Sequence, residues 1–432
     1  GLGDSWRATD IQDYYMPYGH GRPFERKASM ELIYPDEDGE NIQLEAGLRL
    51  AASDWSRGRF RLNETEKSPW TSTAAHKPSF NLFFRNEYGD EELDFPLVKN
   101  YRVRKFDQLR LRAGKNDIRN PWIKDELARR LFGDTGQLSS QGIQSAVFVN
   151  GAYKGYYNTV TRLRTTLFQE YYGTSEPWDI KHIRSWTEGD DTFYEQAVFL
   201  LEKDLDNLEN YQAALAMVDP VNIADYLIVN TYGATWDWPH NNFVMARERS
   251  ETGKWRMYLW DAEGVFGQSG DHGQTRKVIQ TDILDNSRVN ATNKNIVEVS
   301  QLLMESSEFR LLFADRLQRH FFSPDGALTE DNAICRMEEL ADEIEGLMRF
   351  SGNGAPNLGV VRSWIEKREK ELFSKGHFTD VGLWSDTQAP AFRKHGGTVA
   401  VGFEARLSAG TIFNPQDGDI IYTTDGSDPR LI

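Results

Sequence analysis

The most informative stretch of the chain is residues 236–267, WDWPHNNFVMARERSETGKWRMYLWDAEGVFG. Two apolar runs that alternate with polar residues, NFVMARE and KWRMYLW, flank the turn sequence Ser-Glu-Thr-Gly, and this pattern predicts a β-hairpin. Asp237 is followed five positions later by Asn242, and Asp261 stands at the end of the second run. The stretch is therefore either a tryptophan-rich hairpin with incidental acids or a device that holds a metal ion against phosphate.

The interpretation as a metal and phosphate site is based on the requirements of phosphoryl transfer. The reaction needs a carboxylate beside the accepting hydroxyl, oxygen ligands for Mg²⁺ and a cation on the phosphates. Protein kinases place an aspartate, an asparagine five residues later, a short hairpin and a second aspartate in this order. The same order predicts that Asp237 serves the hydroxyl while Asn242 and Asp261 bind the metal. On spacing alone we favour the simpler interpretation, in which Asp237 caps a turn and Asp261 ends a strand.

Strand patterns dominate the first part of the chain and helix patterns the part after about residue 165, which predicts an α+β fold. Asn150-Gly151 between two alternating runs predicts a hairpin. Residues 120–133 predict a helix with Asn120 as N-cap and Gly133 past its end. A second helix is expected to begin at the cap Asp219. A Pro- and Gly-containing boundary near residue 388 separates a large domain from a small β module.

Several separate motifs give the chain a resemblance to the CotH kinase family. That family has an Asp-x-x-x-His-Asn-Asn run followed by Trp-Asp-x-Asp-Gly-x-Phe-Gly, which WDWPHNN and WDAEGVFG resemble. Other stretches occur in the family's order: ASMELIYPDEDG, EAGLRLAASDWSR, HKPSFNLFFRNEYG, WIKDELARRLFG and VFVNGAYKGYYNTVTR. The motifs cover Lys27 to Gly267, and the following helices correspond by position only.

The resemblance implies a reduced, atypical protein-kinase-like domain over residues 27–385. It implies ATP with Mg²⁺ or Mn²⁺ as cofactors, and transfer to Ser or Thr hydroxyls of a secreted or surface protein. The residues that it assigns are Asp237 as the catalytic carboxylate, Asn242, Asp261 and Glu263 as metal ligands, Lys77 as the cation on the phosphates, and His240 and Asn241 in supporting cofactor-binding roles.

This chain departs from the family pattern at several positions. Glu263 replaces an aspartate, Ala51-Ala52 replaces a glycine-bearing turn, and Asn81 stands in SFNL where the family has SFRL. Thr161 replaces a glutamate that follows the GYYN strand. If that glutamate orients the phosphate-binding lysine or a metal, its loss weakens turnover. The acids of the 120–133 helix, Asp125 and Glu126, are possible substitutes, but we expect them to be solvated. The alternative function is therefore a catalytically weak or inactive pseudokinase-like binding module of a large surface or matrix protein.

The two ends of the chain carry separate expectations. Residues 1–26 form a polar and aromatic lead-in arm. Residues 388–432 contain GDIIYTTDGSDPR, which is similar to the C-terminal repeat of chitobiases and β-hexosaminidases, a small β-sandwich of secreted bacterial proteins. Asp425 and Asp428 are expected to be turn residues, with calcium ligation as the alternative. This ending is compatible with further domains in a longer parent chain. The tryptophans and this module also leave carbohydrate binding as a third, weaker alternative.

Composition limits the other classes of function. The formal charge of −16 argues against a general nucleic-acid partner. Cys335 is the only cysteine, which suits an exported bacterial protein at the cell surface and also a cytoplasmic one. The sequence contains no apolar run of membrane-spanning length, no H-E-x-x-H and no G-x-S-x-G. Tryptophans 236, 238, 255 and 260 are expected in the core. RVRKFDQLRLR (102–112) is a local basic run, for which we expect a half-exposed strand with alternating arginines and keep contact with phosphates as the alternative.

Overall fold

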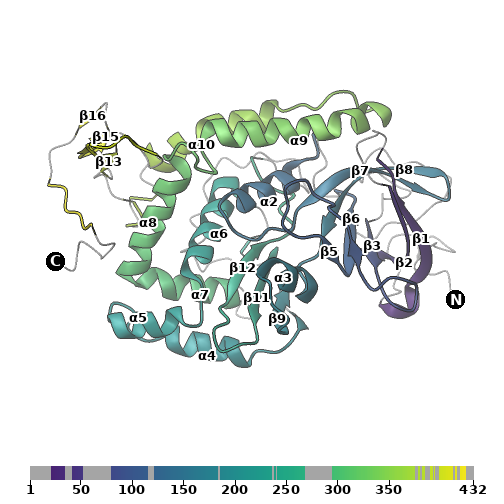
Figure 1. Ribbon diagram of the computed structural model, residues 1–432, viewed down its shortest axis with the longest axis horizontal. Coiled ribbons are helices and arrows are strands. Elements are labelled where there is room, and N and C mark those ends of the chain that lie inside the picture. The colour runs from purple at the N-terminus through teal and green to yellow at the C-terminus, as the bar shows by residue number, and fades with distance from the viewer. Residues whose placement is uncertain are drawn as a thin grey trace.

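The computed structural model confirms an α+β fold, with a β-rich first part and a helical second part (Figure 1). It describes residues 21–34, 41–51, 79–114, 121–182, 185–235, 238–239, 241–267, 294–374, 378–379, 382–384, 390–392, 394, 398–411, 414–415 and 419–424.

A six-stranded antiparallel sheet forms the β-rich part, in the order β1-β2-β3-β6-β8-β7. The strands are β1 (Arg26–Leu32), β2 (Ile42–Ala51), β3 (Ser79–Phe83), β6 (Gln108–Arg112), β7 (Gly142–Val149) and β8 (Ala152–Thr161). The predicted hairpin at Asn150-Gly151 joins β7 and β8, and both residues have positive φ, as a type I′ turn requires. Short elements accompany this sheet: η1 (Arg22–Phe24), β4 (Leu93–Asp94) and β5 (Lys105–Phe106).

The predicted hairpin of residues 236–267 is confirmed and lies in a second sheet, of order β10-β9-β11-β12. Its strands are β9 (Trp178–His182), β10 (Ser185–Glu188), β11 (Phe243–Glu248) and β12 (Arg256–Leu259). Strand β11 is buried along most of its length, between β9 and β12. The hairpin is thus a central part of the fold.

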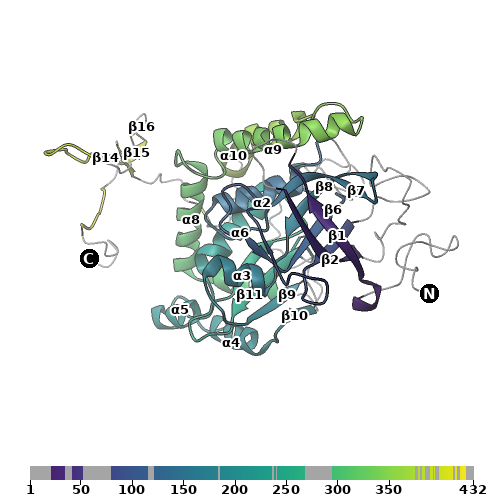
Figure 2. The same cartoon turned by 45° about the vertical axis from the view of Figure 1, so that its right-hand side comes forward.

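Helices cover the second sheet and fill the C-terminal part (Figures 1 and 2). Their bounds are α2 (Lys124–Asp134), α3 (Thr165–Tyr172), α4 (Thr192–Leu201), α5 (Leu208–Leu215), α6 (Pro220–Gly233), α7 (Lys294–Glu305), α8 (Ser307–Phe321), α9 (Glu330–Phe350) and α10 (Gly359–Ser374). Helix α6 begins as predicted, because the Asp219 carboxylate accepts a hydrogen bond from the Asn222 N–H at 3.1 Å.

Two hydrophobic cores hold these parts together. One lies among the helices and includes Leu127 and Leu131 of α2 together with α6 residues such as Tyr226. The other lies between the sheets, where Leu109 of β6 belongs to the same cluster as Ile180 of β9. Side chains alternate along a strand, so Arg110 and Arg112 lie on the face of β6 opposite to Leu109.

The prediction for helix α2 was wrong at both ends. The helix begins at Lys124 rather than after Asn120, which lies outside the described residues. Trp122 has φ 59°, a left-handed backbone conformation that an α-helix excludes, so the helix starts only beyond it. Gly133 lies within the helix, which ends at Asp134.

Four short strands lie in the predicted C-terminal module: β13 (Ala391–Phe392), β14 (Leu407–Ser408), β15 (Gly410–Thr411) and β16 (Asn414–Pro415). They pair as β13-β14 and β15-β16. The motif residues Asp425 and Asp428, like the arm at residues 1–20, lie outside the described residues. The resemblance to a chitobiase-type repeat therefore stays a prediction.

Candidate functional site

The β11–β12 hairpin brings Asn242 and Asp261 to the same end of the second sheet. Phe243 pairs with Leu259, so the next residues outward along the two strands are Asn242 on one and Trp260 and Asp261 on the other. Both candidate ligands have a left-handed backbone, with φ 59° at Asn242 and 58° at Asp261. Non-glycine residues adopt this conformation infrequently, and it concentrates at functional sites.

Arg112, the last residue of β6, is the centre of the polar site. Its Nη2 donates to Asp261 Oδ1 and, at 2.6 Å, to Glu263 Oε1, while its Nε lies 2.9 Å from Asp125 Oδ2. Its side chain is only 7% exposed, so these ion pairs are largely screened from water. One guanidinium thus joins the first sheet, helix α2 and the turn after β12.

Electrostatics reinforce this arrangement. Burial alone would raise the pKa of Asp125, but the positive charges of Arg112 and Arg129 outweigh it and hold this pKa below its ordinary value. Burial alone would lower the pKa of Arg112, but the carboxylates around it, Asp125 first, raise this pKa well above its ordinary value. Asp125 and Arg112 therefore both favour their charged forms.

Asp125 also fixes the backbone of the turn that carries Asp261. Its Oδ1 accepts a hydrogen bond of 2.8 Å from the Ala262 N–H. The turn is held from the other side as well, because the Phe266 N–H donates to the Gly233 carbonyl at the end of α6 at 2.9 Å. The position of Asp261 thus depends on α2 and α6 in addition to its own strand.

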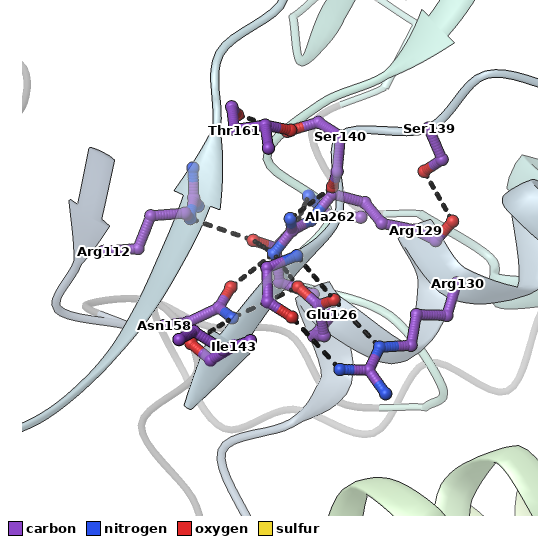
Figure 3. A network of polar contacts seen from close by, with 12 residues as sticks. Arg112, Glu126, Arg129, Arg130, Ser139, Ser140, Ile143, Asn158, Thr161 and Ala262 are labelled. Carbon is purple, nitrogen blue, oxygen red and sulfur yellow. Dashed lines mark hydrogen bonds and ion pairs between the residues drawn. The ribbon is translucent and has the colours of Figure 1, made fainter. Parts of the chain in front are cut away.

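Glu126, the neighbour of Asp125 on α2, is the centre of a second network beneath the first (Figure 3). Its side chain is 1% exposed and pairs with Arg129 at 2.8 Å and with Arg130 at 3.0 Å. It also accepts hydrogen bonds from the Gly142 N–H and from Asn158 Nδ2, at 3.0 and 3.1 Å. The expectation that Asp125 and Glu126 are solvated was therefore wrong. Glu126 faces β7 and β8, and Asp125 faces Arg112 of β6 and the turn after β12.

The other predicted site residues fall into two groups. Glu263 is buried beside Arg112, and Asn241 is partly exposed just before β11. Asp237, His240 and Lys77 lie outside the described residues. The structure thus brings Asn242, Asp261 and Glu263 to one region, and the assignments of Asp237, His240, Asn241 and Lys77 stay predictions.

Thr161, which replaces the family's glutamate, ends β8 and is fully buried. Its hydroxyl lies 3.4 Å from Ser140 Oγ, and its carbonyl accepts a bond from the same hydroxyl. Ser140 in turn presents its carbonyl to Arg129. The side chain at position 161 therefore contacts the edge of the Glu126 network, among hydroxyl groups.

The donor set suits a hard cation in its chemistry. Carboxylate and amide oxygens are the ligands that Mg²⁺ prefers, and Asn242, Asp261 and Glu263 supply them. Within the described part of the chain, no three His, Cys, Asp or Glu side chains are arranged around a common metal position. Instead, the carboxylates of Asp261 and Glu263 share the Nη2 atom of Arg112.

The tryptophan prediction is confirmed for three of the four residues. Trp238, Trp255 and Trp260 are buried, and Trp236 lies outside the described residues. Trp238 donates a 2.7 Å hydrogen bond to the Tyr226 hydroxyl of α6, which anchors the segment before β11. These rings are structural, so they give no support to sugar stacking.

Arg112 is the main residue that the sequence did not reveal. It belongs to RVRKFDQLRLR, which was expected to form a half-exposed strand, and for Arg112 that expectation was wrong. The available signal was the alternation of Arg110 and Arg112 with two leucines, which predicts two basic side chains on one face of a strand. Their partners lie too far along the chain for spacing to reveal them.

Part of the chain matches a known protein family. Residues 173–372 match the family described as CotH kinase protein. No curated protein matches the sequence. Among solved structures, the crystal structure of the Helicobacter pylori proinflammatory kinase CtkA is 12% identical over 71% of this chain and 94% of its own, with a TM-score of 0.26. A likeness at that TM-score carries no argument. Among the described residues, no helix is long and apolar enough to cross a membrane.

The family match includes Asn242, Asp261 and Glu263, whereas Arg112 and Asp125 precede it. The resemblance of the motifs between Lys27 and residue 172 to this family therefore stays a prediction. Within the matched region the order of motifs and the family agree. Residues 173–372 are thus similar to the CotH kinase family over somewhat less than half of the chain, and this likeness supports a protein kinase-like function.

Proposed function

We propose that this chain is a protein kinase that transfers the γ-phosphate of ATP to Ser or Thr hydroxyls of a secreted or surface protein. The observation that carries the proposal is the Arg112 cluster, in which one buried cation on a sheet joins a helix carboxylate, Asp125, to the Asp261 carboxylate. Phosphoryl transfer requires a cation and metal-binding oxygens in one place. The family match supplies independent support.

Each residue has a definite role in this proposal. Asp237 accepts the proton of the attacking hydroxyl, and Lys77 and Arg112 bind the phosphates, with His240 and Asn241 supporting the nucleotide. Asn242, Asp261 and Glu263 hold Mg²⁺ or Mn²⁺, which neutralises charge on the phosphates when it is bound. Asp125 orients Arg112 through the 2.9 Å ion pair.

Nucleotide binding gives the first test. Isothermal titration of the protein with ATP is expected to show binding in millimolar Mg²⁺ that weakens by about tenfold or more when EDTA replaces the metal, since Asn242 and Asp261 would hold a metal ion that offsets the charge of the phosphates. ADP and adenosine serve as reference ligands. Binding of equal strength with and without metal would contradict the assignment of Asn242 and Asp261.

A second candidate function is a catalytically inactive binding module. Two observations favour it: Arg112 already neutralises Asp261 and Glu263, and Thr161 stands among hydroxyl groups where the family has a glutamate. In an inactive module the arginine takes the place of the metal. The two candidates differ in what Arg112 does for Mg²⁺–ATP.

The variant Arg112→Gln separates them. For a kinase, loss of this cation is expected to weaken Mg²⁺–ATP binding by about tenfold or more, the scale of one lost charge-assisted hydrogen bond to phosphate. For an inactive module, removing the competing cation is expected to strengthen metal binding at the freed carboxylates. The measurement is titration with Mg²⁺–ATP and with Mn²⁺ alone, and Arg336→Gln, which loses an exposed ion pair to Asp134, is the control.

The setting of the protein is part of the same proposal. We place the chain outside a bacterial cell, at the surface or in a matrix, with a protein as its phosphate acceptor. The support is the likeness of residues 388–432 to a repeat found in secreted proteins. Fractionation of cells that express the full-length protein, followed by detection with an antibody against this chain, tests the location.

A further inference from the structure

Four cationic or potentially cationic side chains surround the ring of Trp260. The guanidinium carbons of Arg162, Arg112 and Arg110 lie 5.2, 5.4 and 5.6 Å from its centroid. The imidazole of His182 approaches the same ring edge-on, with the centroids 5.6 Å apart. Cation–π contacts of this kind are ordinary singly, but three arginines on one indole concentrate positive charge in a small volume.

The fold explains why these groups meet. Arg110 of β6 pairs with Val160 of β8, and Arg162, two residues further along, is therefore its diagonal neighbour on the same face. His182 ends β9, and Trp260 follows β12 in the second sheet. The cluster therefore stands at the junction of the two sheets, adjacent along the chain to the candidate metal ligand Asp261.

The members of this cluster differ in their partners. Arg112 binds three carboxylates, and the neighbouring Arg164 pairs with Glu188 and donates to Thr187 at 3.2 Å. By contrast, Nε of Arg110, Nε and Nη1 of Arg162 and Nε2 of His182 are shielded from water, and no hydrogen-bond partner for them is found in the described part of the chain. Buried donors without acceptors are rare in folded proteins because each one loses its hydration.

Electrostatics show that the protein does not compensate this charge. Burial, followed by repulsion from Arg110, Arg164 and Arg112, lowers the pKa of Arg162 well below its ordinary value, and Asp107 opposes the shift only weakly. Burial lowers the pKa of Arg110 to about 10, although Asp261, Glu263 and Asp125 lie near it. Burial and the charges of Arg162, Arg164 and Arg110 lower the pKa of His182 to about 3. The cluster is thus built at a cost to folding.

We propose that Arg110, Arg162 and His182 form a subsite that binds a phosphate group. Guanidinium forks match the oxygens of a phosphate, and a dianion satisfies two arginines at once. A neutral His182 adds a donor at Nε2 in the appropriate tautomer, and Trp260 forms one wall. The phosphate group belongs either to free inorganic phosphate or to the phosphate chain of a nucleotide. This inference goes beyond phosphotransfer, because the subsite binds whether or not the chain turns ATP over.

Thermal unfolding in the presence of anions tests the subsite. The full chain is melted in EDTA at fixed ionic strength with chloride, inorganic phosphate, ATP or adenosine. Phosphate or ATP is expected to raise the melting temperature above the value in chloride, because a ligand of the folded state stabilises it. A response to phosphate identifies the free anion as sufficient, and a response to ATP alone identifies the nucleotide's phosphate chain.

Variants then assign the response to the cluster. Arg162→Gln is expected to weaken anion binding about tenfold or more, the effect of losing one charge-assisted contact, without lowering the melting temperature in chloride. Arg164→Gln, next in the chain and already paired, is the matched control and should keep the wild-type response. If Arg162→Gln does not fold, Arg110→Gln replaces it in the same measurement.

Three results would overturn the proposal: a wild-type response no larger than in chloride, an equal response to adenosine and ATP, or a full response in both Arg162→Gln and Arg110→Gln. The variant Asp261→Asn is expected to keep the anion response, since Asp261 does not belong to the subsite. Loss of phosphotransfer in that variant therefore leaves this inference intact, and failure of the anion response leaves the kinase proposal open to its own test.

Discussion

Replacing Asp261 by asparagine is expected to abolish phosphate transfer, with a loss of about 10²- to 10³-fold or more, as for removal of one preorganised group that stabilises transition-state charge. The amide keeps one oxygen but removes the negative charge that a metal ion and Arg112 both require. The measurement is transfer of labelled phosphate from ATP, with Mg²⁺ or Mn²⁺, to the protein itself and to a Ser/Thr-rich acceptor such as casein.

The matched control is Asp134→Asn. Asp134 also accepts two hydrogen bonds from an arginine, Arg336, at 2.8 and 2.9 Å, but its side chain is 31% exposed at the end of α2. This variant is expected to transfer phosphate at the wild-type rate. Equal incorporation by the wild type and Asp261→Asn would contradict the kinase proposal, and absence of incorporation by the wild type would favour the inactive module.

The largest effect on stability is expected at Glu126. Glu126→Gln removes the charge that Arg129 and Arg130 share in a site that water does not reach, which leaves Arg129 with Asp125 and Arg130 with the more exposed Glu343. Breaking a buried ion pair by removing one partner costs about 3–5 kcal/mol. Urea unfolding followed by tryptophan fluorescence is expected to show a loss of this size in the free energy of unfolding, as a lower midpoint at an unchanged slope.

Glu343→Gln is the control for this prediction. Glu343 also pairs with Arg130, at 2.6 Å, but its side chain is 39% exposed. Exposed pairs contribute about 0–1 kcal/mol, so this variant should unfold near the wild-type midpoint. Equal losses in the two variants would show that the burial of Glu126 does not set its contribution.

The parts of the fold that the sequence predicted are those fixed by neighbouring residues. The hairpin at residues 236–267 follows from strand alternation around a short turn, and its pairing brings Asn242 and Asp261 to the same end of the second sheet. The cap at Asp219 and the turn at Asn150-Gly151 are local in the same sense. Each of these predictions depended only on residues that are close together in the sequence.

The Arg112 cluster could not be predicted in this way. Arg112 precedes Asp261 by 149 residues and Glu263 by 151, and it meets them only because two sheets and α2 pack together. The same packing buries Asp125 and Glu126, which local pattern assigned to solvent. The start of α2 was missed because the left-handed backbone at Trp122 leaves no mark on the sequence. Tertiary contacts decided each of these points.

The left-handed backbone at Asn242 and Asp261 indicates what selection has favoured at these two positions. A left-handed conformation costs a residue with a side chain on the order of 1 kcal/mol, and glycine would relieve that cost at either position. Glycine would also remove the side-chain oxygen at either position. The fold therefore keeps an unfavourable backbone conformation at Asn242 and Asp261, and with it the side-chain oxygens of both residues. This combination is expected where selection has acted on chemistry as well as on stability.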